Sequence, residues 1–228
     1  MAKRPIFIVS LNKTFFKKEI IEFKYFNGFS ISQKQKSIES LHHEYLKKNK
    51  KHRILEISSK SNNEIGVKLS AFNLIISTYK GKKISVESAF QASKVFKNGG
   101  PYLDLLCEPS KKSKKDQRLK NSGELVEFNF FGKTFEAEPK TFFYNWLYIN
   151  TINLHKELAN QLIEFDAFTD IEFNPIKSIN CQAEAAAIYV SLRKQNLLSA
   201  ALKNKDNFKR IVYQLDFPKT KQMTFFDD

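Results

Sequence analysis

The chain has 228 residues, 42% of them hydrophobic, and its 38 Lys and Arg exceed its 24 Asp and Glu to give a formal net charge of +14. This length provides one substantial core, and so large a positive surplus predicts an anionic partner, with nucleic acid first. No apolar run is long enough to cross a membrane, and the short basic and apolar N-terminus does not resemble a secretion signal. We therefore expect a cytoplasmic protein with no membrane partner.

The cysteine and histidine content argues against a disulfide framework and against a metal site. Cys107 and Cys181 lie far apart in the sequence and in apolar surroundings, as reduced thiols do. None of the four histidines has a cysteine at ligand spacing, and we expect no cofactor. The 22 Phe, 8 Tyr and single Trp belong mostly to the core, although aromatic faces beside basic residues also suit a stacked base or an adenosine.

The first half of the chain reads as strands around one helix. Hydrophobic patterns predict strands over residues 4–9 and 19–26, and a helix from Phe29 through Leu46. The basic run 47–53 is either a solvated loop or a patch that follows phosphates. Further predictions are strands at 54–57 and 74–76, with a polar turn at 58–64 between them.

A helix predicted over residues 86–96 carries the most informative pattern. Ser85 is its expected N-cap, and Asn98-Gly99-Gly100-Pro101 is its expected stop signal. Within this helix Glu87, Gln91 and Lys94 occupy positions i, i+4 and i+7 and so share one face. A carboxylate, an amide and an ammonium together are sufficient to cleave a glycosidic bond. The alternative is a solvated polar stripe on an ordinary amphipathic helix.

The second half is predicted to be mostly helical. The most basic segment, residues 109–121, is expected to form a helix that faces solvent or an anion. A hairpin or turn follows at 129–135. Helices are then predicted from Thr141 through Asn150 and onward, over 154–165, and, after an irregular stretch, over the Ala-rich run 183–193. Past residue 200 we expect order to decay.

Four separated segments resemble, in order, the NADAR family (NAD- and ADP-ribose-associated, also called YbiA-like). Residues 68–73, Lys-Leu-Ser-Ala-Phe-Asn, resemble its "leu-ser-asn-phe" loop, and residues 85–94 resemble its Glu-x-x-Phe-Gln-x-x-Lys helix. Trp146 falls where the family has a tryptophan. Residues 166–168, then Asn180 and the Ala-rich helix, resemble the closing motif. Thr169-Asp170 replace the usual Trp-Gly there, and Cys181-Gln182-Ala183 replace the usual glycine ending. The resemblance spans roughly residues 54–195.

This resemblance implies an α+β, predominantly helical fold: a single NADAR-like domain with short N-terminal strands. We expect residues 1–53 to form an extension packed on the main domain, residues 54–200 to form the catalytic domain, and residues 201–228 to form a C-terminal tail. Residues 28–38, followed by Leu41-His42, resemble the subgroup encoded beside DarT-type toxins, which attach ADP-ribose to DNA bases.

The implied function is that of an N-glycosidase, an antitoxin that removes ADP-ribose from guanine in nucleic acid. Its substrate would be ADP-ribosylated DNA or RNA, and a DarT-type toxin is a possible partner. Two alternatives remain open at the level of sequence. One is an N-glycosidase acting on a riboflavin-pathway intermediate, and the other is a non-catalytic module that binds ADP-ribosylated DNA or the toxin.

Cleavage of an N-glycosidic bond passes through an oxocarbenium-like ribose, so a carboxylate must lie near the anomeric carbon and a second group must protonate the departing base. Glu87 is the candidate for the first task. Asp166 is the candidate second carboxylate, with Asp170 as its rival. Lys94 would either pair with a phosphate or form a Schiff base with an opened ribose.

The remaining candidates bind rather than react. Gln91 would orient a ribose hydroxyl, and Trp146 would either stack on the substrate or belong to the core. The predicted set that contacts ADP-ribose and base is completed by Ser70, Phe72, Ser85, Asp170 and Asn180. The predicted phosphate and nucleic-acid contacts are Lys34, Lys36 and Arg53, with other basic residues in 47–53 and 111–120.

The last residues carry a separate motif. Gln222-Met223-Thr224-Phe225-Phe226 resembles the Gln-x-x-Leu-Phe peptides that dock on the bacterial sliding clamp. The sliding clamp is therefore a possible partner, through residues Gln222 to Phe226. The alternative is that the two phenylalanines fold back on the core of the domain.

Overall fold

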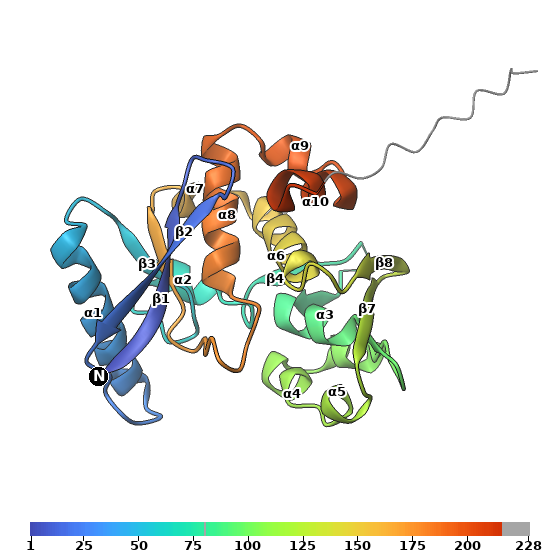
Figure 1. Cartoon of the computed structure of the whole chain (residues 1–228). Helices are drawn as coiled ribbons and strands as arrows, with labels where there is room; N and C mark the ends of the chain where they lie inside the picture. Colours follow the sequence, from blue (N-terminus) through green and yellow to red (C-terminus); the bar gives the residue numbers. More distant parts are fainter. Residues whose placement is uncertain (80, 216–228) are drawn as a thin grey trace, which may run out of the picture.

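The computed structural model describes residues 1–79 and 81–215. They form a single α+β domain with helices on both faces of a four-stranded sheet (Figure 1). The strands are β1 (Ala2–Val9), β2 (Phe16–Phe23), β3 (Ile54–Glu56), β4 (Ile75–Ser77), β5 (Lys83–Ser85), β6 (Lys94–Phe96), β7 (Leu125–Phe130), β8 (Lys133–Glu136) and β9 (Ala167–Thr169). The helices are α1 (Ile31–Lys48), α2 (Glu64–Leu69), α3 (Val86–Ala92), the 3-10 helix η1 (Leu103–Cys107), α4 (Ser110–Lys114), α5 (Arg118–Asn121), α6 (Phe142–Leu154), α7 (Lys156–Leu162), α8 (Gln182–Lys194), α9 (Leu198–Leu202) and α10 (Lys205–Tyr213).

The main sheet joins the N-terminal strands to the rest of the chain. Its order is β2-β1-β9-β3, with β1 antiparallel to both β2 and β9, and with β9 parallel to β3. Successive side chains of a strand point to opposite faces. On β1, Ile6 and Ile8 therefore belong to one apolar cluster, and Phe7 and Val9 belong to the other. The predicted strand at 4–9 is confirmed, and β2 lies three residues before the predicted range.

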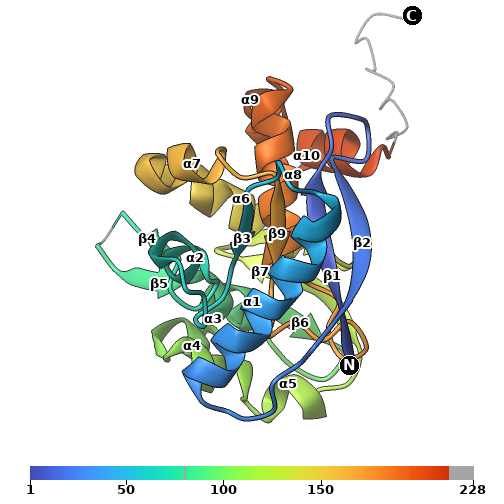
Figure 2. The same ribbon diagram turned by 90° about the vertical axis from the view of Figure 1, so that its left-hand side faces the viewer.

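Helix α1 covers one face of this sheet, as Figure 2 shows from the front. Ser30 caps it by accepting a hydrogen bond from Gln33 N–H at 3.3 Å. Its buried residues Ile38, Leu41 and Tyr45 recur at helical spacing and pack against Phe23 of β2. The predicted helix is thus confirmed to within two residues at each end.

The larger core lies on the opposite face, under α6 and α8. Four alanines of α8, at 183 and 185–187, are completely buried, and such small side chains let the helix pack closely on the sheet and on α6. The long helix expected after Thr141 and the Ala-rich helix are confirmed as α6 and α8. The hairpin expected at 129–135 is confirmed as β7 and β8.

The polar turn predicted at 58–64 is confirmed up to residue 63. It leads into a helix that was not predicted, α2, which Asn63 caps by accepting from Ile65 N–H. Two predicted helices of the middle region are wrong. The single helix expected over 109–121 is two short helices, α4 and α5. The helix expected over 86–96 ends at Ala92, because the next residues pair with β7 as strand β6. Val95 and Phe96 favour that pairing, since β-branched and aromatic residues suit strands.

The expected loss of order past residue 200 is wrong as far as Leu215. Helices α9 and α10 follow there, and Phe208 of α10 is completely buried in the larger core. The Tyr213 hydroxyl lies 3.0 Å from Asn145 Nδ2, which anchors α10 to α6. The motif from Gln222 to Phe226 lies outside the described residues. Among the helices of residues 1–79 and 81–215, none has the length and apolar character needed to cross a membrane.

Candidate active site

A pocket of about 1010 Å³ opens between α3, α4, β7 and the loop that follows β9. Its volume lies at the upper end of the range for small-molecule sites. Glu87 and Asp170 are among its acidic residues, and Phe72, Phe90 and Tyr144 are among its aromatic ones. Besides Lys94, six lysines line it: Lys60, Lys111, Lys114, Lys115, Lys140 and Lys177. The pocket therefore suits an anionic ligand that also offers flat rings.

Glu87 is held in the first turn of α3. Its backbone N–H donates to Ala71 O at 2.9 Å, which joins the helix to the loop at 70–73. Its side chain is 5% exposed and accepts a hydrogen bond from Gln91 Nε2 at 2.9 Å. The predicted i, i+4 pairing of these two residues is confirmed. Gln91 Oε1 is buried without a hydrogen-bond partner in the described part of the chain, so it remains available to a ligand.

Lys94 reaches the same pocket from a strand and not from the helix. Because α3 ends at Ala92, the predicted i+7 position does not exist, and Lys94 pairs with Phe128 on β7. Its ammonium lies 4.8 Å from the centre of the Phe90 ring. Burial lowers the pKa of Lys94 to about 8, with a smaller contribution in the same direction from Lys114, while Glu87 opposes the shift.

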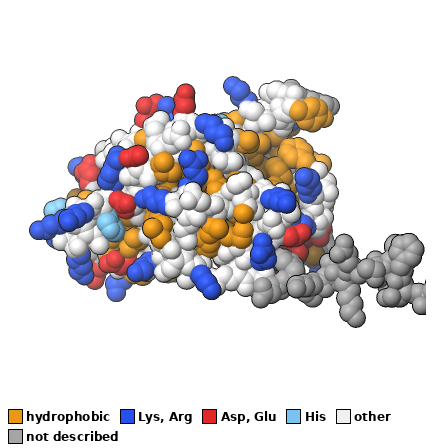
Figure 3. Space-filling view, turned by 90° about the horizontal axis from the view of Figure 1, so that it is seen from above, with side chains coloured by type: hydrophobic (Ala, Val, Ile, Leu, Met, Phe, Trp, Pro, Cys, Tyr) orange, Lys and Arg blue, Asp and Glu red, His pale blue; other side chains and the backbone are white. Residues whose placement is uncertain are grey.

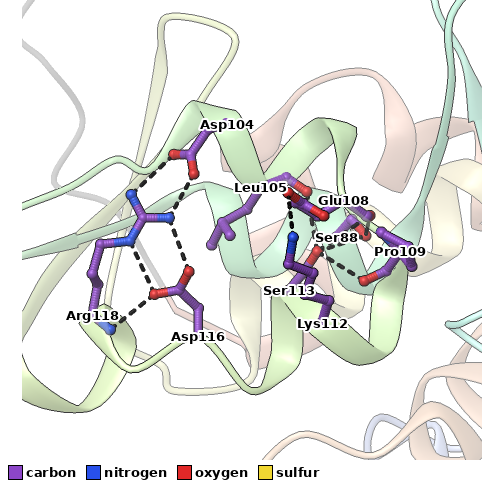
Figure 4. A network of polar contacts seen from close by, with 9 residues as sticks. All are labelled: Ser88, Asp104, Leu105, Glu108, Pro109, Lys112, Ser113, Asp116 and Arg118. Atoms are coloured by element: carbon purple, nitrogen blue, oxygen red, sulfur yellow. Dashed lines mark hydrogen bonds and ion pairs between the residues drawn. The ribbon is translucent and has the colours of Figure 1, made fainter.

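Helix α4 brings lysines to the rim. Lys114 Nζ lies 3.7 Å from Glu87 Oε1 and 5.3 Å from the centre of the Phe72 ring. The helix is fixed by the buried hydroxyl of Ser113, which lies 3.1 Å from Ser88 Oγ and donates to Leu105 O at 3.1 Å (Figure 4). A buried hydroxyl with satisfied hydrogen bonds is costly to displace, so α4 is held firmly against α3.

Arg118, in the basic segment after α4, serves the fold. Arg118 forms ion pairs with Asp104 at 2.6 Å and with Asp116 at 2.9 Å (Figure 4), and it lies over the Tyr102 ring. These carboxylates occupy its guanidinium. The predicted anion-binding segment is therefore divided: Lys111, Lys114 and Lys115 line the pocket, whereas Arg118 ties η1 to α5.

The second carboxylate of the pocket is Asp170. Asp166, the favoured candidate from sequence, does not line the pocket. It accepts from Arg53 N–H at 2.9 Å and lies 3.6 Å from Lys194 Nζ. The two aspartates flank the three-residue strand β9, which separates their backbones by about 13 Å. The sequence does not show which end of that short strand faces the pocket.

Asp170 occupies a firmly held turn. Its Oδ1 accepts from Glu172 N–H at 3.0 Å and from Phe173 N–H at 3.2 Å. Burial raises the pKa of Asp170 well above its usual range, and the nearby carboxylate of Glu56 adds to the shift. Asp170 therefore carries a proton more readily than an exposed aspartate does.

Residues of the closing motif and of the loop at 70–73 lie together in the lining of the pocket. Ser70, Phe72 and Asn180, three of the predicted substrate contacts, all line the pocket. Gln182 was missed by sequence reasoning: its Oε1 accepts from Ala71 N–H and its Nε2 donates to Ile57 O, both at 2.7 Å. Tyr144, also missed, lines the pocket from within the apolar run of α6. Its only signal in the sequence was its position near Trp146.

The model of one family, the DarT1-associated NADAR antitoxin, matches residues 2–222 of the chain. The chain belongs to this family. The match extends beyond the pocket to β1, β2 and α1 at one end and beyond α10 at the other. No curated protein matches the sequence.

Two further predicted site residues of this NADAR protein serve its fold. Trp146 does not line the pocket, and it packs against aromatic neighbours such as Phe135, with ring centres 4.7 Å apart. Its Nε1 is buried without a hydrogen-bond partner among the described residues. Ser85 caps α3 by accepting from Ser88 N–H at 3.0 Å, and its hydroxyl accepts from Ser110 Oγ at 2.7 Å. Neither residue lines the pocket, and both stabilise the elements around it.

The three predicted phosphate contacts lie outside the lining of the pocket. Arg53 pairs with Glu164 at 3.0 Å and covers the Phe165 ring. Lys34 lies 3.3 Å from Glu172, which does line the pocket, while Lys36 is exposed. On the face viewed from above, basic and acidic side chains are dispersed among one another (Figure 3). Within the described residues, no group of His, Cys, Asp or Glu is placed to hold a metal ion.

Proposed function

We propose that this protein is an N-glycosidic-bond hydrolase that removes ADP-ribose from guanine in nucleic acid and so acts as the antitoxin to a DarT1-type toxin. Membership of the DarT1-associated NADAR antitoxin family supports this proposal. The observation that carries it is the meeting of Glu87, Asp170 and Lys94 in one pocket rimmed by lysines. Reversal of the toxin's modification is the chemistry that such a pocket suits best.

Two carboxylates in different environments can divide the work of glycosidic cleavage. Asp170, whose pKa is raised by burial, would donate its proton to the guanine nitrogen as the bond to the anomeric carbon breaks. Glu87 would stabilise the positive charge that develops on the ribose. Its neighbours Gln91 and Lys114 hold its carboxylate in place for that task.

Two routes complete the reaction. In the first, water adds to the anomeric carbon and gives a proton to Glu87. In the second, the free amine of Lys94 forms a Schiff base with the opened ribose, and water then hydrolyses it to regenerate the amine. The lowered pKa of Lys94 favours the second route, because only the neutral amine is a nucleophile.

The rest of the pocket would bind the substrate. Lys111, Lys114 and Lys177 would neutralise the pyrophosphate or the neighbouring phosphates of the strand. Phe72 offers an aromatic face for a base. Asn180 Oδ1 is buried and unpartnered among the described residues, as is Gln91 Oε1, so both are free to accept from ribose hydroxyls.

The test compares three carboxylates. Glu87 and Asp170 line the pocket, whereas Asp166, which the sequence favoured, does not. Glu87→Gln should lower turnover at least about a hundredfold, the usual scale for a lost acid or base, and Asp170→Asn should act likewise. Asp166→Asn should release ADP-ribose from guanine-modified single-stranded DNA at the wild-type rate, since the asparagine oxygen can take the place of Asp166 Oδ2 and accept from Arg53 N–H. Chromatography follows the product.

Near-normal release by Glu87→Gln would remove this residue from the mechanism. Loss of release in Asp166→Asn would instead place the reacting carboxylate outside this pocket. Wild-type activity on a free riboflavin-pathway intermediate, with none on modified DNA, would replace the proposed substrate altogether. Binding of modified DNA without turnover would leave a non-catalytic module.

A further inference from the structure

A buried chain of hydrogen bonds connects α1 to the turn that carries Asp170. His42 Nε2 lies 2.8 Å from Thr169 Oγ1, and the Thr169 hydroxyl donates to Glu56 Oε2 at 2.6 Å. Ile171 N–H donates to Glu56 Oε1 at 2.8 Å. Because the single proton of Thr169 goes to Glu56, His42 Nε2 must be a donor, which fixes the histidine tautomer. These hydrogen bonds therefore reach both sequence neighbours of Asp170, Thr169 and Ile171.

Glu56 is an unusual residue for this position. It is 2% exposed, and Thr169 is completely buried. No lysine or arginine of residues 1–79 and 81–215 forms an ion pair with it. A buried carboxylate without a cation is costly, and an apolar residue would fill the same space. Two of its hydrogen bonds, from the Thr169 hydroxyl and from Ile171 N–H, hold one turn, and that turn brings a second carboxylate into the pocket.

We propose that Glu56 is a positioning residue that holds the Thr169–Asp170–Ile171 turn and keeps the Asp170 carboxyl protonated for the reaction. Two carboxyl groups in one desolvated region cannot both ionise readily, so each favours the proton on the other. The raised pKa values of both groups agree with this arrangement. This role rests on the proposed function only insofar as Asp170 acts as the acid there.

The other groups that face Asp170 come from three helices. Lys114 of α4 stabilises its ionised form, and the amide of Gln182 at the start of α8 also does so. Tyr144 and Tyr148 of α6 and the thiol of Cys181 interact with it electrostatically. After burial, the carboxyl group of Glu56 is the largest influence that opposes ionisation of Asp170, so it is the residue to change.

Glu56→Gln is a suitable change because the hydrogen-bond chain can reverse. The glutamine oxygen still accepts from Ile171 N–H, its amide donates to Thr169, and Thr169 then donates to the other tautomer of His42. The charge is lost while the turn is kept. Titration of the Asp170 side-chain carbon by NMR, assigned with Asp170→Asn, should show a midpoint that falls by about one pH unit.

The matched control is Glu184→Gln. Glu184 is a partly buried carboxylate of α8 that accepts from Asn145 Nδ2 and does not line the pocket. This change should leave the Asp170 midpoint where it is. In Glu56→Gln the alkaline limb of kcat/KM on ADP-ribosylated DNA should move to lower pH by the same amount, because the acid then loses its proton earlier.

An Asp170 midpoint that is unchanged in Glu56→Gln would overturn the proposal, and so would an ordinary midpoint in the wild-type protein. The second measurement does not use Glu56→Gln and decides the matter even if that variant does not fold. A shifted midpoint in a protein that releases no ADP-ribose would support the coupling of the two carboxyls and refute the proposed function alone. The two ideas can therefore fail separately.

Discussion

Trp146 shows how one residue can match a family pattern and still belong to the core. It packs among Phe130, Phe135 and Phe143, and its buried Nε1 has no partner in the described residues. We expect Trp146→Phe to change the free energy of unfolding by less than about 1.5 kcal/mol and to leave turnover unchanged. Urea denaturation and the ADP-ribose release assay measure the two effects. A large loss of turnover at unchanged stability would return Trp146 to the site.

Lys94 offers a chemical test of the two routes. If its amine attacks the ribose, borohydride added during turnover should reduce the Schiff base and leave a stable adduct on the protein. Mass spectrometry of peptides should find the adduct on Lys94, and Lys94→Arg should show none, because a guanidinium stays protonated. With a pKa of about 8, trapping should increase as the pH rises towards 8. An absent adduct would leave Lys94 as a cation for phosphate.

At this scale the sequence predicted several of the residues that meet in the pocket, but not how the fold brings them there. Glu87 and Gln91 were found because helical spacing alone brings them together. Lys94 was placed correctly for the wrong reason, since it arrives on a strand. Asp166 was preferred to Asp170, and Gln182 was missed, because their positions depend on how β9 and α8 pack, which no local spacing reveals.

At the scale of elements, helix α4 positions part of the basic lining of the pocket. Lys111 and Lys114 of this helix both line the pocket. We expect the double change Lys111→Ala/Lys114→Ala to raise KM for ADP-ribosylated single-stranded DNA. The slope of log KM against log salt should also fall by about 0.7 for each phosphate that the variant no longer neutralises. Steady-state kinetics at several salt concentrations measures both.

The control for this prediction has the same change in net charge. Lys133→Ala/Lys156→Ala removes two exposed lysines that do not line the pocket. It should alter neither KM nor its salt dependence by a comparable amount. Equal effects of the two double variants would mean that the overall charge of the protein, and not α4, attracts the strand.

Elements with a strong pattern were predicted well, and short ones were not. Helix α1 has an N-cap residue, and both α1 and the Ala-rich α8 have a buried face that repeats over several turns. Helices α2, α4 and α5 are four to six residues long, too short for a period to emerge. Helices α4 and α5 are held by contacts with η1, such as those of Ser113 with Leu105 and of Arg118 with Asp104.

At the scale of the whole molecule, α10 tests where the folded unit ends. Phe208 is completely buried, and removing a buried phenylalanine side chain usually costs about 3–5 kcal/mol. A chain that ends at residue 203 should therefore melt at a clearly lower temperature than the full chain. A chain that ends at residue 215 keeps all described elements and should melt at a clearly higher temperature than the chain that ends at residue 203. Thermal unfolding followed by circular dichroism decides, and equal melting of both shortened chains would contradict the role of α10.

The arrangement of the sheet has a consequence for how this protein can be divided. Strand β1 covers the edge of β9, and α1 covers the apolar face beside it. A chain begun at residue 54 would contain every residue that lines the pocket, yet it would present an open strand edge and a bare apolar surface to solvent, which invites association between copies. Recombination or gene splitting at that point would separate the pocket from the strand and the helix that cover this edge and this face of the sheet.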